Sequence, residues 1–339
     1  MSNVETECGT RIGADTMHCA CRRRNVGRTT LGAGVLALLT LLASGAGQGS
    51  AQQVDADAKT GTQNRPSQAG QAGPAESPSG AGINRERPRA KVVLPDSSDA
   101  SRALDLSGLK MKLLYEADFS RPLKFVKEES LFDGERRVRV PEGVDWVLEG
   151  QASAEVRGGR LHLNNDTTHL VFWNTRSFPD SFLLDFDVSP AESKLGLNIV
   201  FFAAKGCDGG SIFDLAQPKR DGLFKTYHTG GLNCYHTSYW AVNPEGQQRG
   251  TAHFRKNRGF HLVAAGKDFI AGQGPGPHRV RLLKRGPRLE LEVNGKIASQ
   301  WTDDGQTYGP VLHEGLIGLR QMSHTKQCSY SSFRVWNVE

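Results

Sequence analysis

The sequence lacks the short motifs that mark several common chemistries. Its 339 residues include six cysteines but no C-x-x-C pair, so a zinc site built from cysteines is not expected. There is no phosphate-binding P-loop, no strand-linked G-x-G-x-x-G and no H-E-x-x-H, which excludes the usual nucleotide and zinc-protease patterns. A G-x-S-x-G nucleophile elbow is absent as well, so serine hydrolysis of that type is not expected.

Net charge is also low. The chain has 42 Lys and Arg against 36 Asp and Glu, a formal charge of +6. An excess this weak does not indicate a nucleic-acid partner. It is compatible with an acidic small substrate or polymer but does not require one.

The N-terminal part of the chain reads as an export signal. A basic cluster at Arg22–Arg24 precedes the apolar run Leu31–Ala43, and small residues follow up to Ala51. This order is typical of a signal peptide, and the run is too short to span a bilayer comfortably. We expect an extension and signal peptide over residues 1–51, no membrane span in the mature form, and a secreted or periplasmic location.

The composition then changes twice. Residues 52–105 are mostly Gln, Ala, Gly, Ser and Pro without aromatics, which predicts a disordered linker. Over residues 106–339, short runs rich in Val, Leu, Phe and Tyr alternate with polar residues and are broken by Gly, Pro, Asn or Asp. No amphipathic helix of useful length is visible. The pattern predicts one all-β sandwich or barrel domain.

Two hairpins are recognisable from their turns. Residues 153–163 alternate around Gly158-Gly159, and residues 288–301 alternate around Asn294-Gly295. Asn-Gly between alternating strands favours a two-residue type I′ turn.

Several longer segments together resemble a known family. They are "HLVFWN" (His169–Asn174), "GLNIVFFAAKG" (Gly196–Gly206), "YHTSYW" (Tyr235–Trp240), "FRKNRGFHLVAAGKD" (Phe254–Asp268), "GLIGLRQM" (Gly315–Met322) and "FRVWNV" (Phe333–Val338). The chain resembles the YesU-like family, a domain of unknown function (DUF-1961) in the concanavalin A-like lectin/glucanase superfamily. The resemblance implies a β-jelly-roll sandwich of two antiparallel sheets. It implies a carbohydrate polymer or oligosaccharide as partner more strongly than it implies a reaction, and fold alone does not prove function.

The residues of "YHTSYW" and "FRKN" suit β-elimination from an acidic polysaccharide. That reaction needs a base for the C5 proton and groups that neutralise the uronate carboxylate. We expect His236 or Tyr239 to be the base and Arg255 with Asn257 to bind the carboxylate. Further candidates for substrate binding are His169, Trp173, Tyr227, Trp240, Lys256, Arg320 and Gln321.

Period-two alternation limits this hypothesis. It places His236, Ser238 and Trp240 on one face of their strand and Tyr235, Thr237 and Tyr239 on the other. The two candidate bases then lie on opposite faces unless a bulge intervenes. A strand with these residues also has a plain structural explanation, because aromatic side chains at this spacing commonly belong to a core.

Two alternatives stay open at this point. A glycoside hydrolase needs a pair of carboxyl groups, and Asp185 with Asp187, or Glu290 with Glu292, have the two-residue spacing. Both pairs alternate with apolar residues, as on the wet face of a strand. A non-catalytic, lectin-like protein would use the same aromatic, Arg and Asn side chains to bind a glycan.

No cofactor is predicted, although a structural calcium ion is left open. Asp208 and Asp214 lie in a Gly-rich loop without an EF-hand pattern, which favours a plain loop. Of the cysteines outside the signal region, Cys207 and Cys234 both have a loop-flanked, Gly-rich context, so they are the preferred disulfide pair over pairings with Cys328.

Overall fold

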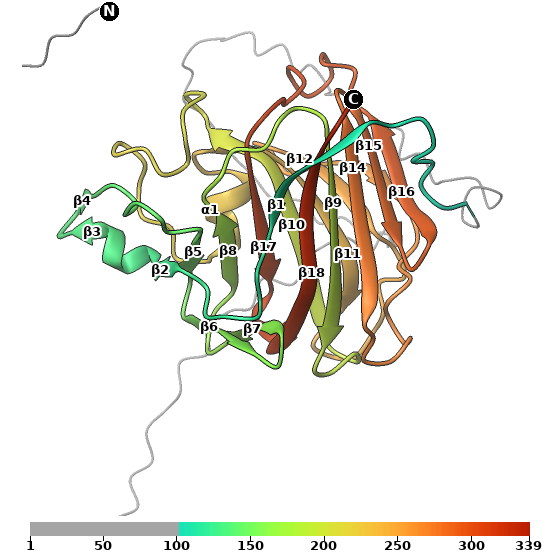
Figure 1. Ribbon diagram of the computed structural model, residues 1–339, viewed down its shortest axis with the longest axis horizontal. Coiled ribbons are helices and arrows are strands. Elements are labelled where there is room, and N and C mark those ends of the chain that lie inside the picture. The colour runs from blue at the N-terminus through green and yellow to red at the C-terminus, as the bar shows by residue number, and fades with distance from the viewer. Residues whose placement is uncertain (1–101) are drawn as a thin grey trace, which may run out of the picture. The chain divides into compact units, whose positions relative to one another are not determined.

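The computed structural model describes residues 102–339. The expected signal peptide and nearly all of the expected linker lie outside the described residues. Two eight-stranded sheets face each other in this part of the chain (Figure 1). Among its helices, none is long and apolar enough to cross a membrane.

Sheet A has the strand order β16-β15-β14-β9-β18-β7-β6, and β1 pairs with β18. All of its pairings are antiparallel. Its strands are β1 (Met111–Glu116), β6 (Ala152–Arg157), β7 (Arg160–Asn165), β9 (Phe182–Pro190), β14 (His278–Arg285), β15 (Arg288–Val293), β16 (Lys296–Thr302) and β18 (Gln327–Val338).

Sheet B has the order β13-β12-β11-β10-β17-β8-β5-β2. Its strands are antiparallel except for the parallel pair β2–β5. They are β2 (Phe125–Lys127), β5 (Trp146–Glu149), β8 (Leu170–Asn174), β10 (Gly196–Gly206), β11 (Leu232–Val242), β12 (His253–Asn257), β13 (His261–Ala265) and β17 (Leu316–Gln321).

The remaining elements are short. A small ribbon pairs β3 (Phe132–Asp133) with β4 (Arg136–Arg137), next to the 3-10 helix η2 (Glu128–Leu131). A second 3-10 helix, η3 (Ser323–Thr325), precedes β18. The α-helix α1 (Phe224–His228) lies in the connection between β10 and β11.

The predicted sandwich and both hairpins are confirmed. β6 and β7 meet at Arg157 and Arg160 across the two glycines. β15 and β16 meet at Val293 and Lys296, and Asn294 and Gly295 both have positive φ, as a type I′ turn requires.

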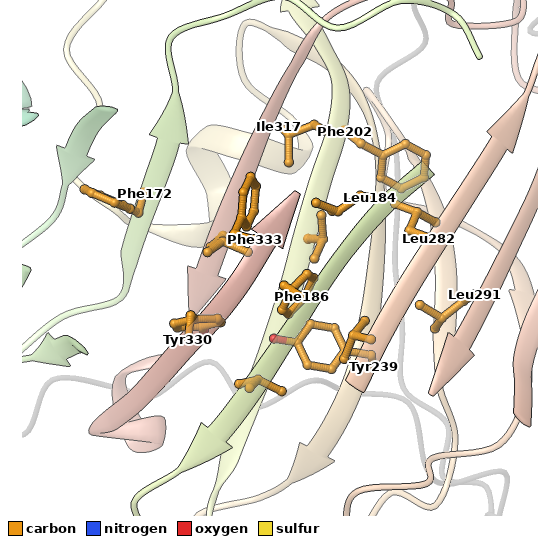
Figure 2. Packing of buried hydrophobic residues seen from close by; sticks show 14 of the residues in the cluster. Phe172, Leu184, Phe186, Phe202, Tyr239, Leu282, Leu291, Ile317, Tyr330 and Phe333 are labelled. Carbon is orange, nitrogen blue, oxygen red and sulfur yellow. The ribbon is translucent and has the colours of Figure 1, made fainter. Parts of the chain in front are cut away.

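The main core fills the space between the sheets (Figure 2). Alternate residues of each strand contribute to it, because a strand presents every second side chain to the same face. Trp146 and Phe172 of sheet B stack with ring centroids 4.7 Å apart, and the Trp146 indole donates a 2.9 Å hydrogen bond to the Tyr115 hydroxyl of sheet A. This core leaves the outer face of sheet B free to carry a different set of residues.

A substitution at Gly318 tests how tightly the outer face of sheet B is packed. A Cβ at Gly318 would lie 2.5 Å from Cε3 of Trp173, a buried ring stacked on Phe201. We expect Gly318→Ala to lower the free energy of unfolding by about 1–3 kcal/mol, the usual cost of overpacking, as measured by urea denaturation.

Gly231→Ala is the matched control for this change. A Cβ at Gly231 meets only the Gln217 side-chain oxygen, at 3.7 Å, and Gly231 has ordinary φ. The control should unfold close to the wild-type urea midpoint. Equal midpoints for Gly318→Ala and wild type would contradict this, because they would show that the Trp173 side chain moves aside without loss of stability.

Candidate functional site

The outer face of sheet B carries polar and aromatic side chains from four neighbouring strands. On β11, His236 lies opposite Phe201 of β10 and Arg255 of β12. On β17, Arg320 lies opposite Ile199 of β10. Alternation along these strands therefore brings His236, Arg255 and Arg320 to one face of the sheet.

This face is covered by the chain itself. The connection between β10 and β11, residues 207–231, folds back over it, and we call it the cover segment. Its residues Ile212, Phe213 and Tyr227 join a second apolar cluster with Trp173 and Phe201 of the sheet. The rings of Trp173 and Phe201 stack at 5.5 Å, and so do those of Phe201 and Tyr227. Trp173, which was expected to line an open groove, is thus covered by this segment.

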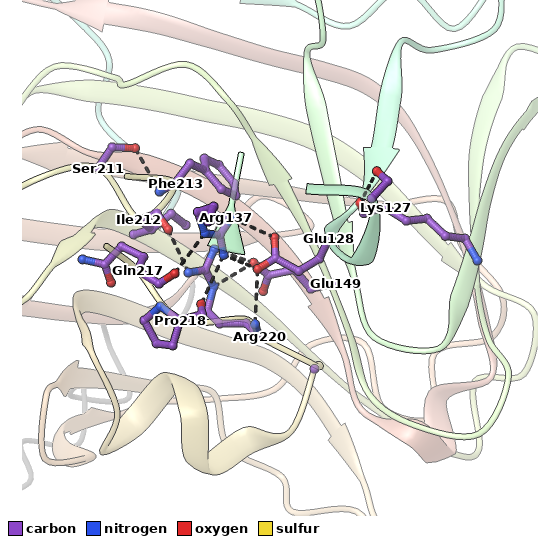
Figure 3. A network of polar contacts seen from close by, with 12 residues as sticks. Lys127, Glu128, Arg137, Glu149, Ser211, Ile212, Phe213, Gln217, Pro218 and Arg220 are labelled. Carbon is purple, nitrogen blue, oxygen red and sulfur yellow. Dashed lines mark hydrogen bonds and ion pairs between the residues drawn. The ribbon is translucent and has the colours of Figure 1, made fainter. Parts of the chain in front are cut away.

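A buried carboxylate attaches the cover segment to the sheet (Figure 3). Glu149, at the end of β5, accepts a hydrogen bond from the Arg220 guanidinium at 2.7 Å. It also accepts a hydrogen bond from the Tyr227 hydroxyl at 2.6 Å. Arg220 also donates to the carbonyl of Ile212 at 2.8 Å. Glu149 is fully buried and Arg220 nearly so, and a charge in such a place must be paired and hydrogen-bonded.

A second ion pair extends this network. Arg137 of β4 pairs with Glu128 of η2 and donates to the carbonyls of Gln217 and Pro218 in the cover segment. Glu128 in turn accepts from the backbone N–H of Arg220 at 3.2 Å. Residues 212–220 of the cover segment are therefore fixed by charged groups with little access to water.

A cationic cluster lies beside the end of the cover segment; we define it as His236, Arg255, Asn257 and Arg320. Their exposed fractions are 2, 6, 2 and 0%. The Arg320 guanidinium lies 4.9 Å from the ring centre of Phe224 and 4.8 Å from that of Tyr227.

Arg255 has similar surroundings. Its guanidinium lies 3.8 Å from the ring centre of Phe260 and donates to the carbonyl of that residue at 3.0 Å. Aromatic faces attract such cations by their quadrupole. Both guanidinium groups of the cluster are therefore positioned by aromatic rings.

His236 is neutral in this cluster. Its Nδ1 lies 3.0 Å from the amide Nδ2 of Asn257, which also lies 3.3 Å from the Cys234 sulfur. Burial, and then the charges of Arg255 and Arg320, hold the pKa of His236 well below its ordinary value. Burial, and then the charges of Arg249 and Arg255, lower the pKa of His253 to about 3.

The site thus combines two charged guanidinium groups with a neutral imidazole. Guanidinium forks bind carboxylates in bidentate geometry. A neutral imidazole can either accept a proton or donate a hydrogen bond, depending on its tautomer. The arrangement is suited to an anionic ligand.

Comparison with known proteins places the chain in a family. The model of a domain of unknown function, DUF1961, matches residues 135–335, more than half of the sequence. This chain belongs to the DUF1961 family. The uncharacterized protein YesU of Bacillus subtilis (strain 168) is 39% identical over 196 residues, which are 56% of this chain and 88% of that protein.

One solved structure supports the fold of this DUF1961 member. A Bacillus subtilis protein of unknown function with a galectin-like fold has 36% identity and a TM-score of 0.53, over 57% of this chain and 90% of that one. A non-specific endo-β-1,3(4)-glucanase from family GH16 has 10% identity and a TM-score of 0.43, over 70% and 96% of the two chains. The DUF1961 domain is an all-β two-sheet sandwich that resembles the galectin-like fold.

Five of the eleven sequence-predicted site residues lie on the outer face of sheet B. His236, Arg255, Asn257 and Arg320 form the cationic cluster, and Trp173 lies on the same face under the cover. Two further candidates lie beside it. Tyr227 is in the cover segment, and His169 precedes β8 and accepts a hydrogen bond from the backbone N–H of Ser323.

Tyr239 and Trp240 lie in the core between the sheets instead (Figure 2 labels Tyr239). β11 has a bulge here, since Ser238 pairs with Ile199 whereas Trp240 pairs with the adjacent Asn198. The extra residue turns Trp240 to the face opposite His236. The prediction that Trp240 shares a face with His236 and Ser238 was therefore wrong, and of the two candidate bases only His236 reaches the cluster.

Lys256 and Gln321 also point away from the cluster. Lys256 donates to the Asp303 carboxylate at 2.7 Å and to the carbonyls of Gly309 and Pro310 at 2.8 Å, so it fastens the loop before β17. Gln321 donates to the Tyr330 hydroxyl at 3.1 Å inside the sandwich. Both are immediate neighbours of cluster residues in sequence, which places them on the opposite face.

The two carboxylate pairs lie on the outer face of sheet A. Asp185 binds the Arg279 guanidinium through both oxygens, at 2.9 and 2.5 Å. Glu292 binds Arg281 and accepts from the backbone N–H of Leu104. These carboxylates balance neighbouring arginines and belong to the other sheet from the cationic cluster.

Other expectations concern metals and thiols. Within residues 102–339, no group of three or more His, Cys, Asp or Glu is arranged to hold a metal ion. Asp208 accepts hydrogen bonds from Gly210 and Gln217.

Cys207, Cys234 and Cys328 are free thiols, so the preferred disulfide between Cys207 and Cys234 is not formed in this structure. Cys207 is exposed, whereas Cys234 is buried beside Asn257.

Sequence reasoning missed the cover segment and its anchor. It also missed Phe224, His228 and Phe260, whose rings contact one another beside His236. A usable signal was present, because Glu149 ends an otherwise apolar strand and a buried carboxylate requires a partner.

The neutral histidines predict an acid-sensitive stability. The unfolded chain protonates His236 and His253 near the ordinary pKa of 6.5, whereas the native site does not. Their contribution to stability is therefore complete above about pH 6.5 and is lost as pH falls, by up to about 1.4 kcal/mol per pH unit for each histidine.

Urea denaturation between pH 7.5 and 5 measures this loss. His236→Gln should give a shallower fall in unfolding free energy than wild type. Identical slopes for wild type and His236→Gln would mean that native His236 takes up its proton as readily as the unfolded chain does.

Proposed function

We propose that this domain is a carbohydrate-active protein that binds an acidic sugar at the cationic cluster and cleaves its glycosidic bond by β-elimination. One observation supports this most strongly. Arg255, Arg320 and neutral His236 come from three strands to one buried place on the outer face of sheet B. A uronate has the matching chemistry, with a carboxylate next to the carbon that must lose a proton.

The reaction assigns each group one task. Arg255 and Arg320 bind the carboxylate of the uronate and stabilise the negative charge that develops on it. The imidazole of His236 takes the C5 proton as the C4–O bond breaks and the C4–C5 double bond forms. The leaving oxygen receives a proton from water or from the imidazolium, so the enzyme returns to its starting state.

The orientation of the Asn257 side-chain amide determines whether His236 can act as the base. If the Asn257 oxygen faces Nδ1, it accepts the Nδ1 proton and leaves Nε2 with a free lone pair for catalysis. The two ends of an amide have nearly the same shape, so this orientation differs from the observed one by a flip alone. In the flipped orientation the Cys234 thiol would donate to the same oxygen.

A non-catalytic, glycan-binding protein is the second candidate, and one contact favours it. With the Asn257 nitrogen facing Nδ1 at 3.0 Å, the proton of His236 lies on Nε2. His236 is then a hydrogen-bond donor to a sugar oxygen and cannot accept the C5 proton there. Hydrolysis has less support, because Asp185 and Glu292 are ion-paired on sheet A.

Incubation of the purified protein with a panel of uronate-containing and neutral glycans tests the proposal. Elimination should raise the absorbance near 235 nm, where an unsaturated uronate absorbs. New reducing ends without this absorbance would instead indicate hydrolysis. Calorimetric binding of uronates without any product would support the glycan-binding alternative.

His236→Gln separates catalysis from binding. We expect at least a hundredfold loss of the 235 nm rate, since positioned bases contribute about 10²–10⁴-fold, with little change in uronate affinity. His162→Gln should retain the wild-type rate. Imidazole ¹⁵N chemical shifts give an independent check: a free Nε2 supports elimination, and a protonated Nε2 supports the glycan-binding alternative.

We also propose, from the N-terminal sequence, that the protein is exported. N-terminal sequencing of the protein recovered from the periplasm or medium tests this, with a mature start near residue 52 as the expected result.

A further inference from the structure

A small cavity at the edge of the sandwich shares no residue with the cationic cluster. Residues 266–277 connect β13, the edge strand of sheet B, to β14. The backbone N–H of Lys267 in this connection donates to the carbonyl of Ala298 in β16, the edge strand of sheet A, at 2.7 Å. The cavity has a volume of about 260 Å³ and is lined by Lys267, Asp268, Phe269, Gln273, Asn294 and Lys296. Four of these residues are exposed, so a ligand reaches the cavity directly from solvent.

Two lysines of this cavity face one aromatic ring. Nζ of Lys267 and Nζ of Lys296 each lie 5.4 Å from the ring centre of Phe269, which is half-buried. The two ammonium groups are thus no farther from each other than twice that distance. Within residues 102–339, neither of these lysines forms an ion pair with a carboxylate. Two like charges repel each other, and an anion bound between them would offset the repulsion.

The floor of the cavity is held in place by hydrogen bonds. The carboxylate of Asp268 accepts hydrogen bonds from three backbone N–H groups, those of Ala241, Ile270 and Ala271. These bonds satisfy the carboxylate within the protein, so Asp268 fixes the connection and pairs with neither lysine. Asn294 donates from Nδ2 to the carbonyl of Phe269 at 3.2 Å. The backbone that carries the ring is therefore held in position before any ligand binds, which lowers the entropy cost of binding.

The lining combines positive charge with apolar surface. The ammonium groups of Lys267 and Lys296 form charge-assisted hydrogen bonds with carboxylate or sulfate oxygens, and the Gln273 amide can bind hydroxyls. The Phe269 ring and the methylene stems of the lysines provide an apolar surface, against which the C–H face of a sugar ring packs. The volume lies below the roughly 300–1,000 Å³ of pockets for drug-sized ligands, which suits a single sugar residue.

We infer that this cavity, which we call the edge site, binds one acidic sugar residue of a glycan. Lys267 and Lys296 bind its carboxylate or sulfate group, Phe269 packs against its ring, and Gln273 contacts its hydroxyls. The inference goes beyond the proposed function, because it requires neither the cationic cluster nor a reaction. Through the edge site, the domain holds an acidic polysaccharide at its surface.

Lysine footprinting of the full chain tests this inference. Limited acetylation with acetic anhydride, read by mass spectrometry, compares the protein alone with the protein in tetragalacturonate or in a sulfated galactose tetrasaccharide. Low ionic strength is used, because salt screens exposed charges. We expect one or both sugars to slow acetylation of Lys267 and Lys296 at least threefold. Lys110 and Lys112 are exposed internal controls at β1, on the far side of β18 from β16, and should react at an unchanged rate.

Neutral cellotetraose and sodium sulfate complete the comparison. Cellotetraose should protect neither edge-site lysine, because it lacks a charge. Sulfate should protect both less than the acidic tetrasaccharide does, because it cannot pack against Phe269. Unchanged acetylation of both lysines in either acidic sugar would overturn the inference, and so would equal protection by sulfate alone. The cationic cluster contains no lysine, so neither result bears on the proposed function, which the 235 nm assay tests separately.

Paired substitutions check the charges independently. Lys267→Gln/Lys296→Gln should weaken calorimetric binding of the protecting tetrasaccharide at least fivefold. Lys110→Gln/Lys112→Gln is the matched control, since it removes the same charge from exposed residues at β1, and should leave the affinity unchanged. Equal losses in the two double variants would mean that net charge accounts for the binding and would overturn the edge site.

Phe269→Leu examines the ring. It keeps an apolar side chain but removes the flat surface, and should weaken tetrasaccharide binding at least threefold. Sulfate affinity close to that of wild type would show that the lysines are still in place in this variant. Tetrasaccharide affinity that does not change would contradict the role of Phe269 as the surface for a sugar ring.

Discussion

The carboxylate of Glu149 holds the candidate site together. It lies on sheet B without access to water, and the two groups that satisfy it, Arg220 and Tyr227, both come from the cover segment. A buried carboxylate without partners is strongly unfavourable. Folding of sheet B therefore commits the connection between β10 and β11 to one position, across the outer face.

That position changes the chemistry of everything beneath it. An open sheet face would leave His236 and Arg320 in water, where their charges are screened. Under the cover, burial keeps the pKa of His236 low, and the guanidinium groups lie against aromatic rings. Charge interactions are stronger in such surroundings than in water. The same segment that covers this face of the sheet therefore also determines the electrostatic surroundings of the cationic cluster.

Local periodicity explains how much of this could be predicted from sequence. Two-residue alternation and the Asn294-Gly295 turn depend only on neighbouring residues, and they predicted the strands and the hairpins correctly. The assignment of faces along β11 held from Tyr235 to Ser238, because the strand pairs regularly with β10 and β12 there. It failed after Ser238, where one extra residue shifts the register against β10. A bulge is decided by pairing with another strand, so alternation within β11 alone does not reveal it.

The cover segment could not be predicted for a related reason. Residues 207–231 have the Gly, Asp and Pro content of an ordinary loop, and their position depends on partners far away in sequence. Arg220 and Glu149 are 71 residues apart, and Arg137 and Gln217 are 80 apart. Apart from Glu149 at the end of an apolar strand, none of these residues has a sequence context that singles it out. These residues are linked only because every buried charge needs a partner. Which charges are buried is known once the fold is known. A carboxylate at the end of an apolar strand is then a reason to search distant loops for an arginine.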